Sequence, residues 1–405
     1  MDKKRILLIL LFVAAAAIFA YGLYYLFIRK PTAPLVINLP PVNAPTGILP
    51  IAPTGAPPGL ITNLPSAAAP LPTASDVARG GITKSPVLTE NSILNPTLSS
   101  DGKNINFYDP ANAKFYRIGA DGKIIELSGK NFYNVKKITW SPQGDKGILE
   151  YPDESKIFYD FTSGRQTTLP KHWEGFSFDA GGNQIVAKSI ATDINNRWLI
   201  TANPDGTNAN VVLPLGRNGD KVQDTWSPAG GVIAFSDTGR PQGFARKQII
   251  PIDPAGETLN PLIVEGLDFK PLWSKDGDKL IYSTYSPDSD YKPEIWITNA
   301  QGEQSGTGRK RLNLNTWADK CAFYDNNTVY CAVPETLETG AGFAPIVANQ
   351  SRDILYKIDL ETGLKTLVAM PESGSSMKNL IFSADGTTMY FTDSNSERLL
   401  KMQIK

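Results

Sequence analysis

A short segment recurs seven times along this chain, and it constrains the fold more than any other feature. The clearest copy is PLWSKDGDKLIYS at residues 271–283, in which an aromatic residue and a serine are followed by a polar Asp-Gly turn and an apolar stretch. Six further copies, in chain order, are PTLSSDGKNINFY (96–108), ITWSPQGDKGILEY (138–151), FSFDAGGNQIVAK (176–188), DTWSPAGGVIAFS (224–236), CAFYDNNTVYCAV (321–333) and LIFSADGTTMYFT (380–392). Aligned on the residue before the serine or its equivalent, successive copies are 38–59 residues apart. Repeats of about 40–50 residues with β-type segments are typical of propeller blades.

Each unit continues in a similar way, with a polar loop, another strand, a turn and a last strand. In the fifth unit these pieces are KLIYSTY, EIWITNA, the turn QGEQ and RKRLNLNTW. Four short strands leave no length for crossover helices, so the sequence predicts an all-β, antiparallel fold. Asp-Gly pairs at the hairpin tips tolerate the positive φ that tight turns require. We therefore predict a seven-bladed β-propeller, with six or eight blades as alternatives because the sixth unit is irregular.

The aromatic residues before the serine are predicted to fill the gap between adjacent blades. Trp140, Trp226, Trp273 and Phe382 are thus interpreted as structural core residues rather than as platforms for a ligand. The last unit is too short for a fourth strand, and the segment GGITKSPVLTEN (80–91) precedes the first unit without a hairpin partner. We predict that residues 80–91 supply the outer strand of blade seven, which closes the ring and covers a sheet edge.

The N-terminal region predicts a membrane anchor. Residues 6–28 are 23 consecutive residues without a charge, and about 20 apolar residues in a helix span a bilayer. The alternative is a cleaved signal peptide, whose apolar region is usually about 7–15 residues long. Residues 1–5 include three basic residues, so this short tail is expected to stay in the cytoplasm. The chain is then a single-pass protein of the cytoplasmic membrane with its propeller outside it.

Residues 29–79 are predicted to be a linker that leads to a propeller domain at 80–405. Twelve prolines lie between residues 31 and 75, where no side chain is charged. Proline removes backbone donors and fixes φ, so the linker is expected to be an extended or disordered spacer. It would hold the propeller away from the bilayer, and the alternative role is binding of a partner that recognises proline-rich chain.

The charge of the chain excludes one class of function. Residues 31–405 contain four more acidic than basic residues and no long run of basic residues. Nucleic-acid binding requires clustered Lys and Arg side chains that neutralise phosphates. Nucleic acid is therefore not expected as a partner.

The repeat resembles a known family. WSPQGDK, WSPAGGV, WSKDGDK and FSADGTT look like the WD40-like (PD40) repeat of TolB-type propellers and of the propeller domain of dipeptidyl peptidase IV-like enzymes, and EIWITNAQGE is similar to the third strand and turn of that repeat. The resemblance covers roughly residues 80–405. It implies an extracytoplasmic scaffold that binds protein partners, and it carries over no catalytic residue because the repeat is structural. A TolB protein would have a separate globular N-terminal domain, and no such domain is expected from residues 1–79.

The sequence shows no catalytic constellation. His172 is the single histidine, so a site with several histidine ligands is impossible, and no G-x-S-x-G nucleophile motif occurs. Asp288, Asp290 and Glu294 in SPDSDYKPE could offer oxygen ligands to calcium, but they lack the glycine and the spacing of an EF-hand. A carboxylate pair of the glycosidase type could come from several blades, and nothing local singles one out. No metal, cofactor or catalytic residue is predicted.

Two cysteines lie in one predicted hairpin. Cys321 and Cys331 flank the segment AFYDNNTVY. A three-residue loop from Asp325 to Asn327 would place the cysteines opposite each other and permit a disulfide, whereas a two-residue loop would put them out of register. The alternative is a pair of free, buried thiols.

These observations predict a non-catalytic binding or assembly scaffold in the cell envelope, as in a secretion or pilus complex. The long insertion at 334–353 with Phe343, and the loop at 238–247 with Arg240, Phe244 and Arg246, are the candidate partner contacts because they lie outside the expected strands. Two alternatives remain open: a propeller hydrolase or lyase with its active site at the central channel, and a surface receptor for carbohydrate or peptide. Clustered carboxylates at the channel mouth would favour the enzyme.

Overall fold

A computed structural model describes residues 73–119 and 121–405, together with the single positions 12, 18 and 21. The predicted cytoplasmic tail, the predicted membrane span at 6–28 and most of the predicted linker lie outside these residues. Among the residues that are described, no helix is long and apolar enough to cross a membrane.

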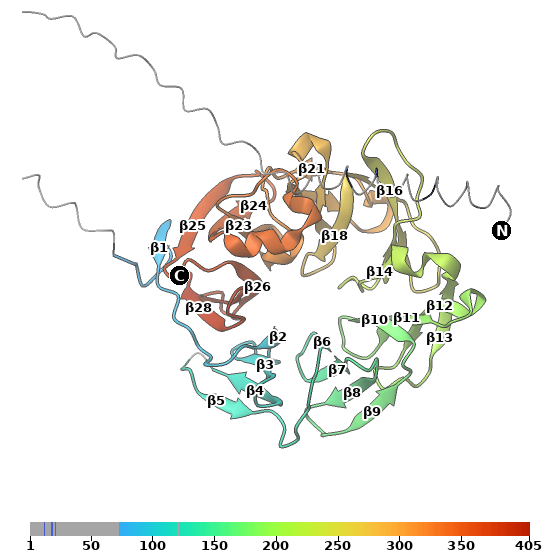
Figure 1. The fold of residues 1–405 in the computed structure, drawn as a ribbon, viewed down its shortest axis with the longest axis horizontal. Coiled ribbons are helices and arrows are strands. Elements are labelled where there is room, and N and C mark those ends of the chain that lie inside the picture. The colour runs from blue at the N-terminus through green and yellow to red at the C-terminus, as the bar shows by residue number, and fades with distance from the viewer. Residues whose placement is uncertain (1–11, 13–17, 19–20, 22–72, 120) are drawn as a thin grey trace, which may run out of the picture. The chain divides into compact units, whose positions relative to one another are not determined.

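The described chain forms seven β-sheets around a central axis, and the prediction of an all-β, seven-bladed propeller is confirmed (Figure 1). Each blade is a meander in which consecutive strands pair antiparallel. The innermost strands of the seven blades, in chain order, are β2 (Leu94–Leu98), β6 (Lys137–Trp140), β10 (Trp173–Phe178), β14 (Val222–Asp224), β18 (Leu267–Trp273), β22 (Cys321–Asp325) and β26 (Met377–Phe382).

The other strands lie outside these in sequence order. Blades one to four continue with β3 (Ile105–Asp109), β4 (Lys114–Ile118), β5 (Ile124–Glu126), β7 (Lys146–Glu150), β8 (Lys156–Asp160), β9 (Gln166–Leu169), β11 (Ile185–Ile190), β12 (Arg197–Ala202), β13 (Asn210–Pro214), β15 (Ala234–Ser236), β16 (Arg246–Ile252) and β17 (Leu262–Glu265). Blades five to seven continue with β19 (Lys279–Tyr285), β20 (Pro293–Asn299), β21 (Lys310–Arg311), β23 (Thr328–Pro334), β24 (Asp353–Asp359), β25 (Lys365–Pro371), β27 (Thr388–Asp393) and β28 (Leu399–Gln403).

Short 3₁₀ helices occupy the connections. They are η1 (Ile194–Asn196), η2 (Gly216–Lys221), η3 (Pro287–Ser289), η4 (Gly302–Gln304), η5 (Ala318–Lys320), η6 (Ala341–Phe343) and η7 (Pro345–Gln350). Because every innermost strand begins on the same side of the ring, the connections between blades and the loops between second and third strands share that side. We call it the entrance face.

The repeated turn explains why the segment recurs. In blade five, Ser274 Oγ bonds to carboxylate oxygens of Asp276 and Asp278, both at 2.9 Å, and accepts the backbone N–H of Lys279 at 3.0 Å. Gly277 has a φ of +78°, and a Cβ there would lie 2.7 Å from the backbone nitrogen of Ala229 in blade four. The glycine thus permits both the tight turn and the close approach of the neighbouring blade.

The repeat aromatics contact the preceding blade. Trp140 donates its indole N–H to the carbonyl of Asn95 in blade one at 2.7 Å. The ring of Trp273 stacks on Phe235 of blade four with centroids 5.4 Å apart. Phe382 packs on Tyr330 of blade six at 4.9 Å. Trp226 belongs to the core shared by blades three and four.

The predicted outer strand of blade seven is wrong in its position. Strand β1 (Gly81–Thr83) pairs in parallel with β25, so it becomes the fifth strand of blade six, and among described residues the blade-seven sheet has three strands. The chain reaches β28 only through single bridges, Val77 to Gln403 and Val87 to Leu400. Pro86 lacks a backbone N–H, which limits pairing along β28.

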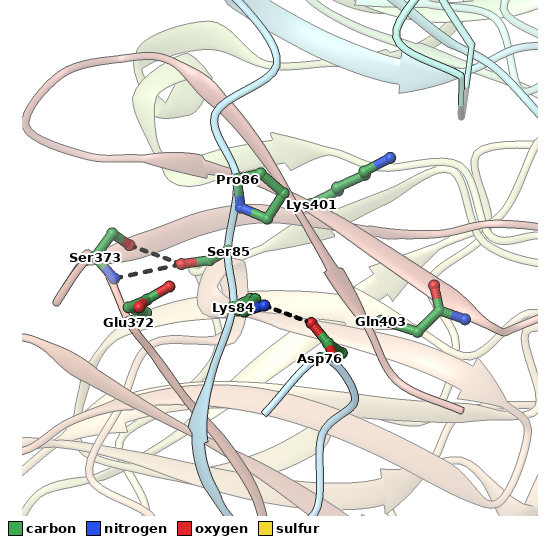
Figure 2. A pocket seen from close by; sticks show the side chains of 8 residues that line it. All are labelled: Asp76, Lys84, Ser85, Pro86, Glu372, Ser373, Lys401 and Gln403. Carbon is green, nitrogen blue, oxygen red and sulfur yellow. Dashed lines mark hydrogen bonds and ion pairs between the residues drawn. The ribbon is translucent and has the colours of Figure 1, made fainter. Parts of the chain in front are cut away.

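We call residues 73–89 the N-terminal strap, because they join the outer edges of blades six and seven. A cavity of about 420 Å³ lies between the strap and β28 (Figure 2). Along one side of it, Ser85 Oγ lies 3.0 Å from Ser373 Oγ, and Lys84 forms a 2.7 Å ion pair with Asp76. The strap therefore closes the ring at its outer rim.

Candidate functional site

Several innermost strands carry a β-bulge. Register shifts occur in β2, β10, β18 and β26, the innermost strands of blades one, three, five and seven. Each shift includes one residue with positive φ; these are Asn95, Gly175, Asp268 and Asn379. A bulge re-aims the neighbouring side chains, and here it does so on the strands that surround the axis.

A group of charged side chains from blades two to four lies at the entrance face. We call it the charged cluster; it comprises Lys137, Glu150, Glu174, Lys188 and Asp224. In blade two, Lys137 Nζ lies 3.1 Å from Glu150 Oε1. In blade three, Lys188 Nζ lies 3.7 Å from Glu174 Oε1 and donates to the carbonyls of Gly219 and Val222, both at 3.1 Å.

The exposure of these groups differs in a way that matters chemically. The side chain of Glu174 is 52% exposed and that of Lys137 is 53% exposed, whereas Lys188 is 13% exposed. Glu174 and Lys137 can therefore contact a ligand at the entrance face, whereas Lys188 is held by two backbone carbonyls.

Asp224 stands apart within the cluster. Both of its carboxylate oxygens are buried and have no hydrogen-bond partner among the described residues. Burial raises the pKa of Asp224 well above its ordinary value, an effect that Lys188 opposes and that Glu174 adds to. The Asp224 carboxyl group is therefore held in its neutral form over a range where an exposed aspartate is charged.

Gly175 makes this arrangement sterically possible. Its φ is +65°, and a Cβ at this position would lie 2.0 Å from Asp224 Oδ2 and 3.1 Å from Lys188 Cε. The bulge of β10 thus brings the backbone of blade three directly against the Asp224 carboxyl group, immediately after Glu174.

Other lysines at the entrance face are also paired. Lys270 lies 3.1 Å from Asp268 in blade five, and Lys378 lies 2.6 Å from Glu397 in blade seven. Lys320, at the start of blade six, forms a buried 2.6 Å ion pair with Asp353. Charged groups from blades two to seven therefore lie on the entrance side of the ring, and the Lys320–Asp353 pair among them is buried.

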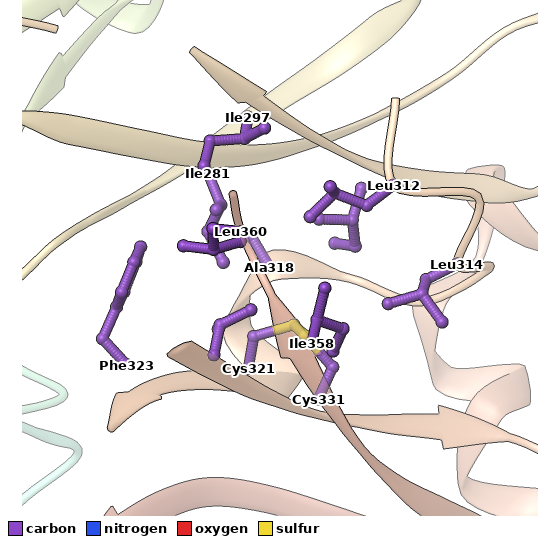
Figure 3. Close-up of a cluster of buried hydrophobic side chains, with 12 residues drawn as sticks. Ile281, Ile297, Leu312, Leu314, Ala318, Cys321, Phe323, Cys331, Ile358 and Leu360 are labelled. Atoms are coloured by element: carbon purple, nitrogen blue, oxygen red, sulfur yellow. A yellow bond between two sulfur atoms is a disulfide. The ribbon is translucent and has the colours of Figure 1, made fainter. Parts of the chain in front are cut away.

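A disulfide joins Cys321 to Cys331, which are cross-strand partners in blade six (Figure 3). The turn between the strands has two residues, Asn326 and Asn327, rather than the three that we expected. A register shift between Phe323 and Asp325 restores the alignment of the cysteines. The bulge, rather than a three-residue loop, therefore places Cys321 opposite Cys331.

The two predicted contact loops differ in structure. Phe244 is 85% exposed in the β15–β16 loop, which also carries Arg240, and Arg246 at its end lies 3.4 Å from Glu265. By contrast, the insertion at 334–353 is docked on blade five. Gly342 N donates to the Tyr291 carbonyl at 2.8 Å, and the Phe343 ring packs on Tyr285 and Tyr291.

The remaining candidates do not form a site. His172 is exposed in the connection between β9 and β10. Glu294 pairs with Arg311 rather than turning toward Asp288 or Asp290. Within residues 73–119 and 121–405, no group of three His, Cys, Asp or Glu side chains could hold a metal ion.

Sequence reasoning missed the charged cluster. Its members lie up to 87 residues apart, between Lys137 and Asp224, and only the packing of adjacent blades brings them together. One signal was present: Lys137, Lys270 and Lys378 each stand three or four residues before a repeat aromatic, on strands that are otherwise mostly apolar. A charged residue that recurs at the start of the innermost strand indicates charged side chains around the propeller axis.

Comparison with known proteins shows likeness at the level of fold. No family model and no curated protein sequence matches the chain. An oligogalacturonate lyase in complex with manganese is similar over 79% of this chain and 92% of its own, with a TM-score of 0.55 and 13% identity. The oligogalacturonate lyase of Vibrio parahaemolyticus is similar over 79% and 93%, with a TM-score of 0.54 and 11% identity. TolB from Acinetobacter baumannii is similar over 66% and 65%, with a TM-score of 0.43 and 15% identity.

These findings correct the expectation of a non-catalytic scaffold. Both oligogalacturonate lyases are enzymes built on a propeller that covers nearly their whole length, so the predictions of a scaffold and of no enzymatic activity are overturned. Identities of 11–13% establish a shared fold only. The activity of this chain must therefore be argued from its own residues.

The manganese bound to one of these lyases has no matching donor set here. His172 is the single histidine, and it is exposed in a blade connection. The described residues include no cluster of three His, Cys, Asp or Glu side chains with metal-binding geometry. The described residues therefore do not fit a manganese site of protein ligands.

Proposed function

We propose that the protein is a propeller lyase that cleaves an acidic oligosaccharide at the charged cluster. The observation that carries the proposal is the pairing of a solvent-exposed Glu174 with the fixed cation Lys188, together with an exposed Lys137 whose charge acts on the same Asp224 carboxyl group. The likeness to oligogalacturonate lyases supports the reaction class and a substrate made of uronate units.

The proposed reaction is an elimination. Lys137 pairs with the carboxylate of the uronate ring, which makes the neighbouring C–H group more acidic because charge that develops there is neutralised. Glu174 accepts that proton. The electron pair forms a carbon–carbon double bond as the glycosidic C–O bond breaks, and the departing oxygen takes a proton from water at the open mouth.

Asp224 acts in this scheme as a positioning residue. Its neutral carboxyl group packs against the Gly175 backbone, where a Cβ would lie only 2.0 Å from Oδ2. This contact fixes the bulge that directs Glu174 toward the mouth, and no proton transfer to substrate is assigned to Asp224.

We also propose that the propeller lies outside the cytoplasmic membrane, tethered by the N-terminal residues. The Cys321–Cys331 disulfide supports this location, because such bonds persist in oxidising compartments.

The test is a lyase assay on the purified full-length protein with oligogalacturonates. The unsaturated uronate product absorbs ultraviolet light, so its appearance reports elimination and distinguishes it from hydrolysis. We expect Glu174→Gln to lower the rate at least about 100-fold, the usual range for loss of a proton-transfer group.

Glu257→Gln is the matched control, because Glu257 is an exposed glutamate in the β16–β17 turn on the opposite face. It should leave the rate unchanged. Binding of the oligosaccharide without any product would favour the receptor alternative and reject the lyase. Full activity of Glu174→Gln would reject the assignment of Glu174.

A further inference from the structure

A cavity of about 210 Å³ opens at the entrance face between blades six and seven. Three separate parts of the chain line it. The connection into blade six contributes Trp317, Asp319 and Lys320. The blade-six insertion contributes Pro345, Ile346, Ala348 and Asn349, and blade seven contributes Lys378 and Ser394. We call it the insertion cavity.

Two buried donors in its lining have capacity to bond a ligand. Trp317 is only 2% exposed, and its buried indole Nε1 has no hydrogen-bond partner among the described residues. A buried donor normally has a partner. Lys320 Nζ bonds to Asp353 at 2.6 Å and to Ser376 Oγ at 3.1 Å. An ammonium group has three N–H donors, so these two contacts leave one.

The charge of the lining favours an anion. Lys320 and Lys378 line the cavity, whereas their partner carboxylates, Asp353 and Glu397, do not. Asp319 is the one carboxylate in the lining, and it is exposed. The positive ends of two ion pairs therefore face the cavity and their negative ends lie outside its lining.

The remaining surface suits the apolar face of a small ring. Pro345 and Ile346 border the cavity, and Ile346 is 74% exposed although it adjoins buried Ala348. Ligand sites commonly combine an apolar wall with a few convergent polar groups. The volume is below the range of about 300–1,000 Å³ for drug-sized ligands, which limits the occupant to about one sugar ring.

We propose that the insertion cavity is a subsite that holds one acidic sugar ring of the substrate. The ring lies on Pro345 and Ile346, its carboxylate faces Lys378, and an oxygen accepts the Trp317 N–H. The inference rests on the proposed function for the class of ligand. It gives the blade-six insertion a role in substrate binding, apart from the charged cluster of blades two to four.

The test is a calorimetric titration of the full-length protein with galacturonate, and with galactose as its neutral counterpart. Galacturonate should bind more tightly than galactose. Trp317→Phe keeps an aromatic ring but removes the N–H, and it should weaken galacturonate binding about tenfold, as expected for one buried hydrogen bond. Trp296→Phe, in blade five, is its control and should bind as the unaltered protein does.

A second variant guards against misfolding of the buried Trp317 change. Lys378→Met, at a side chain that is 35% exposed, should weaken galacturonate binding and leave galactose binding nearly unchanged. Lys357→Met, at an exposed position of β24, is the control. Equal binding of the two sugars, or unchanged galacturonate binding in both Trp317→Phe and Lys378→Met, would overturn the subsite.

The outcome is separable from that of the lyase assay. The lyase assay of Glu174→Gln reports on the charged cluster, because Glu174 does not line the insertion cavity. Binding that depends on Trp317 and Lys378 without any lyase activity would retain the subsite and reject the enzyme. Lyase activity in a protein whose galacturonate binding is unaffected by Trp317→Phe and Lys378→Met would retain the enzyme and reject the subsite.

Discussion

The buried position of the Asp224 carboxyl group depends on the absence of a side chain at Gly175. The carboxyl group has no hydrogen-bond partner among the described residues and touches the backbone of Gly175, where any Cβ would collide with it. A buried carboxylate without a partner costs several kcal/mol when charged, so the neutral form prevails. The stability of the protein should therefore depend on the protonation of this residue.

We expect Asp224 to make the protein less stable as the pH rises. Burial raises the folded-state pKa above the ordinary value of 3.8, so the folded protein holds a proton that the unfolded chain releases. The stabilisation of the folded protein by the proton on Asp224 is complete below about pH 4, and it is lost as the pH rises through the raised pKa. Each unit of the shift corresponds to about 1.4 kcal/mol. Urea unfolding across this range measures it.

The comparison variant is Asp224→Asn, which cannot ionise. Its stability relative to the unaltered protein should improve steadily as the pH rises above about 4, because only the carboxyl group loses its proton. Asp220→Asn, at an exposed position in η2, should show no such trend. A stability difference between Asp224→Asn and the unaltered protein that is the same at every pH would contradict the account.

At the scale of elements, blade six combines irregular features. Its first hairpin has a two-residue turn and a bulge, and its second connection is the insertion that packs on blade five. The disulfide lies in a core that includes Ile358 and Leu360 from the third strand and the residues after it, and Ile281 from blade five (Figure 3). The bond therefore fixes a hairpin that also contributes to the contact between two blades.

We expect the disulfide to stabilise the protein by about 2–3 kcal/mol, because it closes a short loop in the unfolded chain. Adding a reductant should lower the midpoint of thermal unfolding. The double variant Cys321→Ala, Cys331→Ala should unfold at a lower temperature than the oxidised protein and should not respond to reductant. Equal unfolding midpoints of the oxidised and reduced protein would show that the bond contributes nothing.

The elements also show where prediction from sequence succeeded. Six hairpin tips carry Gly with positive φ between the first two strands, and such local turn chemistry can be read directly from the sequence. The insertion was identified as an outlier in length, but its docking on Tyr285 and Tyr291 depends on a loop of another blade. Contacts of that kind have no local signature.

At the scale of the propeller, the N-terminal strap takes the place of a full outer strand. Its backbone bonds reach both blades: Gly80 N donates to Val368 O, and Thr83 O accepts from Glu372 N, in blade six, while Ala78 N donates to Gln403 O and Leu88 N to Leu399 O in blade seven. One short segment thus ties the last blade to its neighbour.

Removal of the strap should destabilise the ring. A chain that begins at Thr73 retains these bonds, whereas a chain that begins at Asn91 loses them. At about 0.5–1.5 kcal/mol for each of these four net hydrogen bonds, the second chain should be less stable by about 2–6 kcal/mol. Denaturant unfolding of the two chains measures the difference, and equal midpoints would show that blade seven closes the ring without the strap.

The sequence by itself determined the structure of the blade and predicted seven blades, while the structure excluded six and eight. The recurring turn, the aromatic before it and the strand lengths are local properties, each decided by φ preferences and by the alternation of apolar residues within about 15 residues. Only the tertiary structure decided which side chains meet at the entrance face. Glu174, Lys188 and Asp224 converge because blade four packs against blade three and a bulge at Gly175 allows their close approach. Strand β1 of the strap pairs with β25 rather than with β28. The sequence could not predict this choice, because pairing between strands far apart in the chain depends on the geometry of the whole ring.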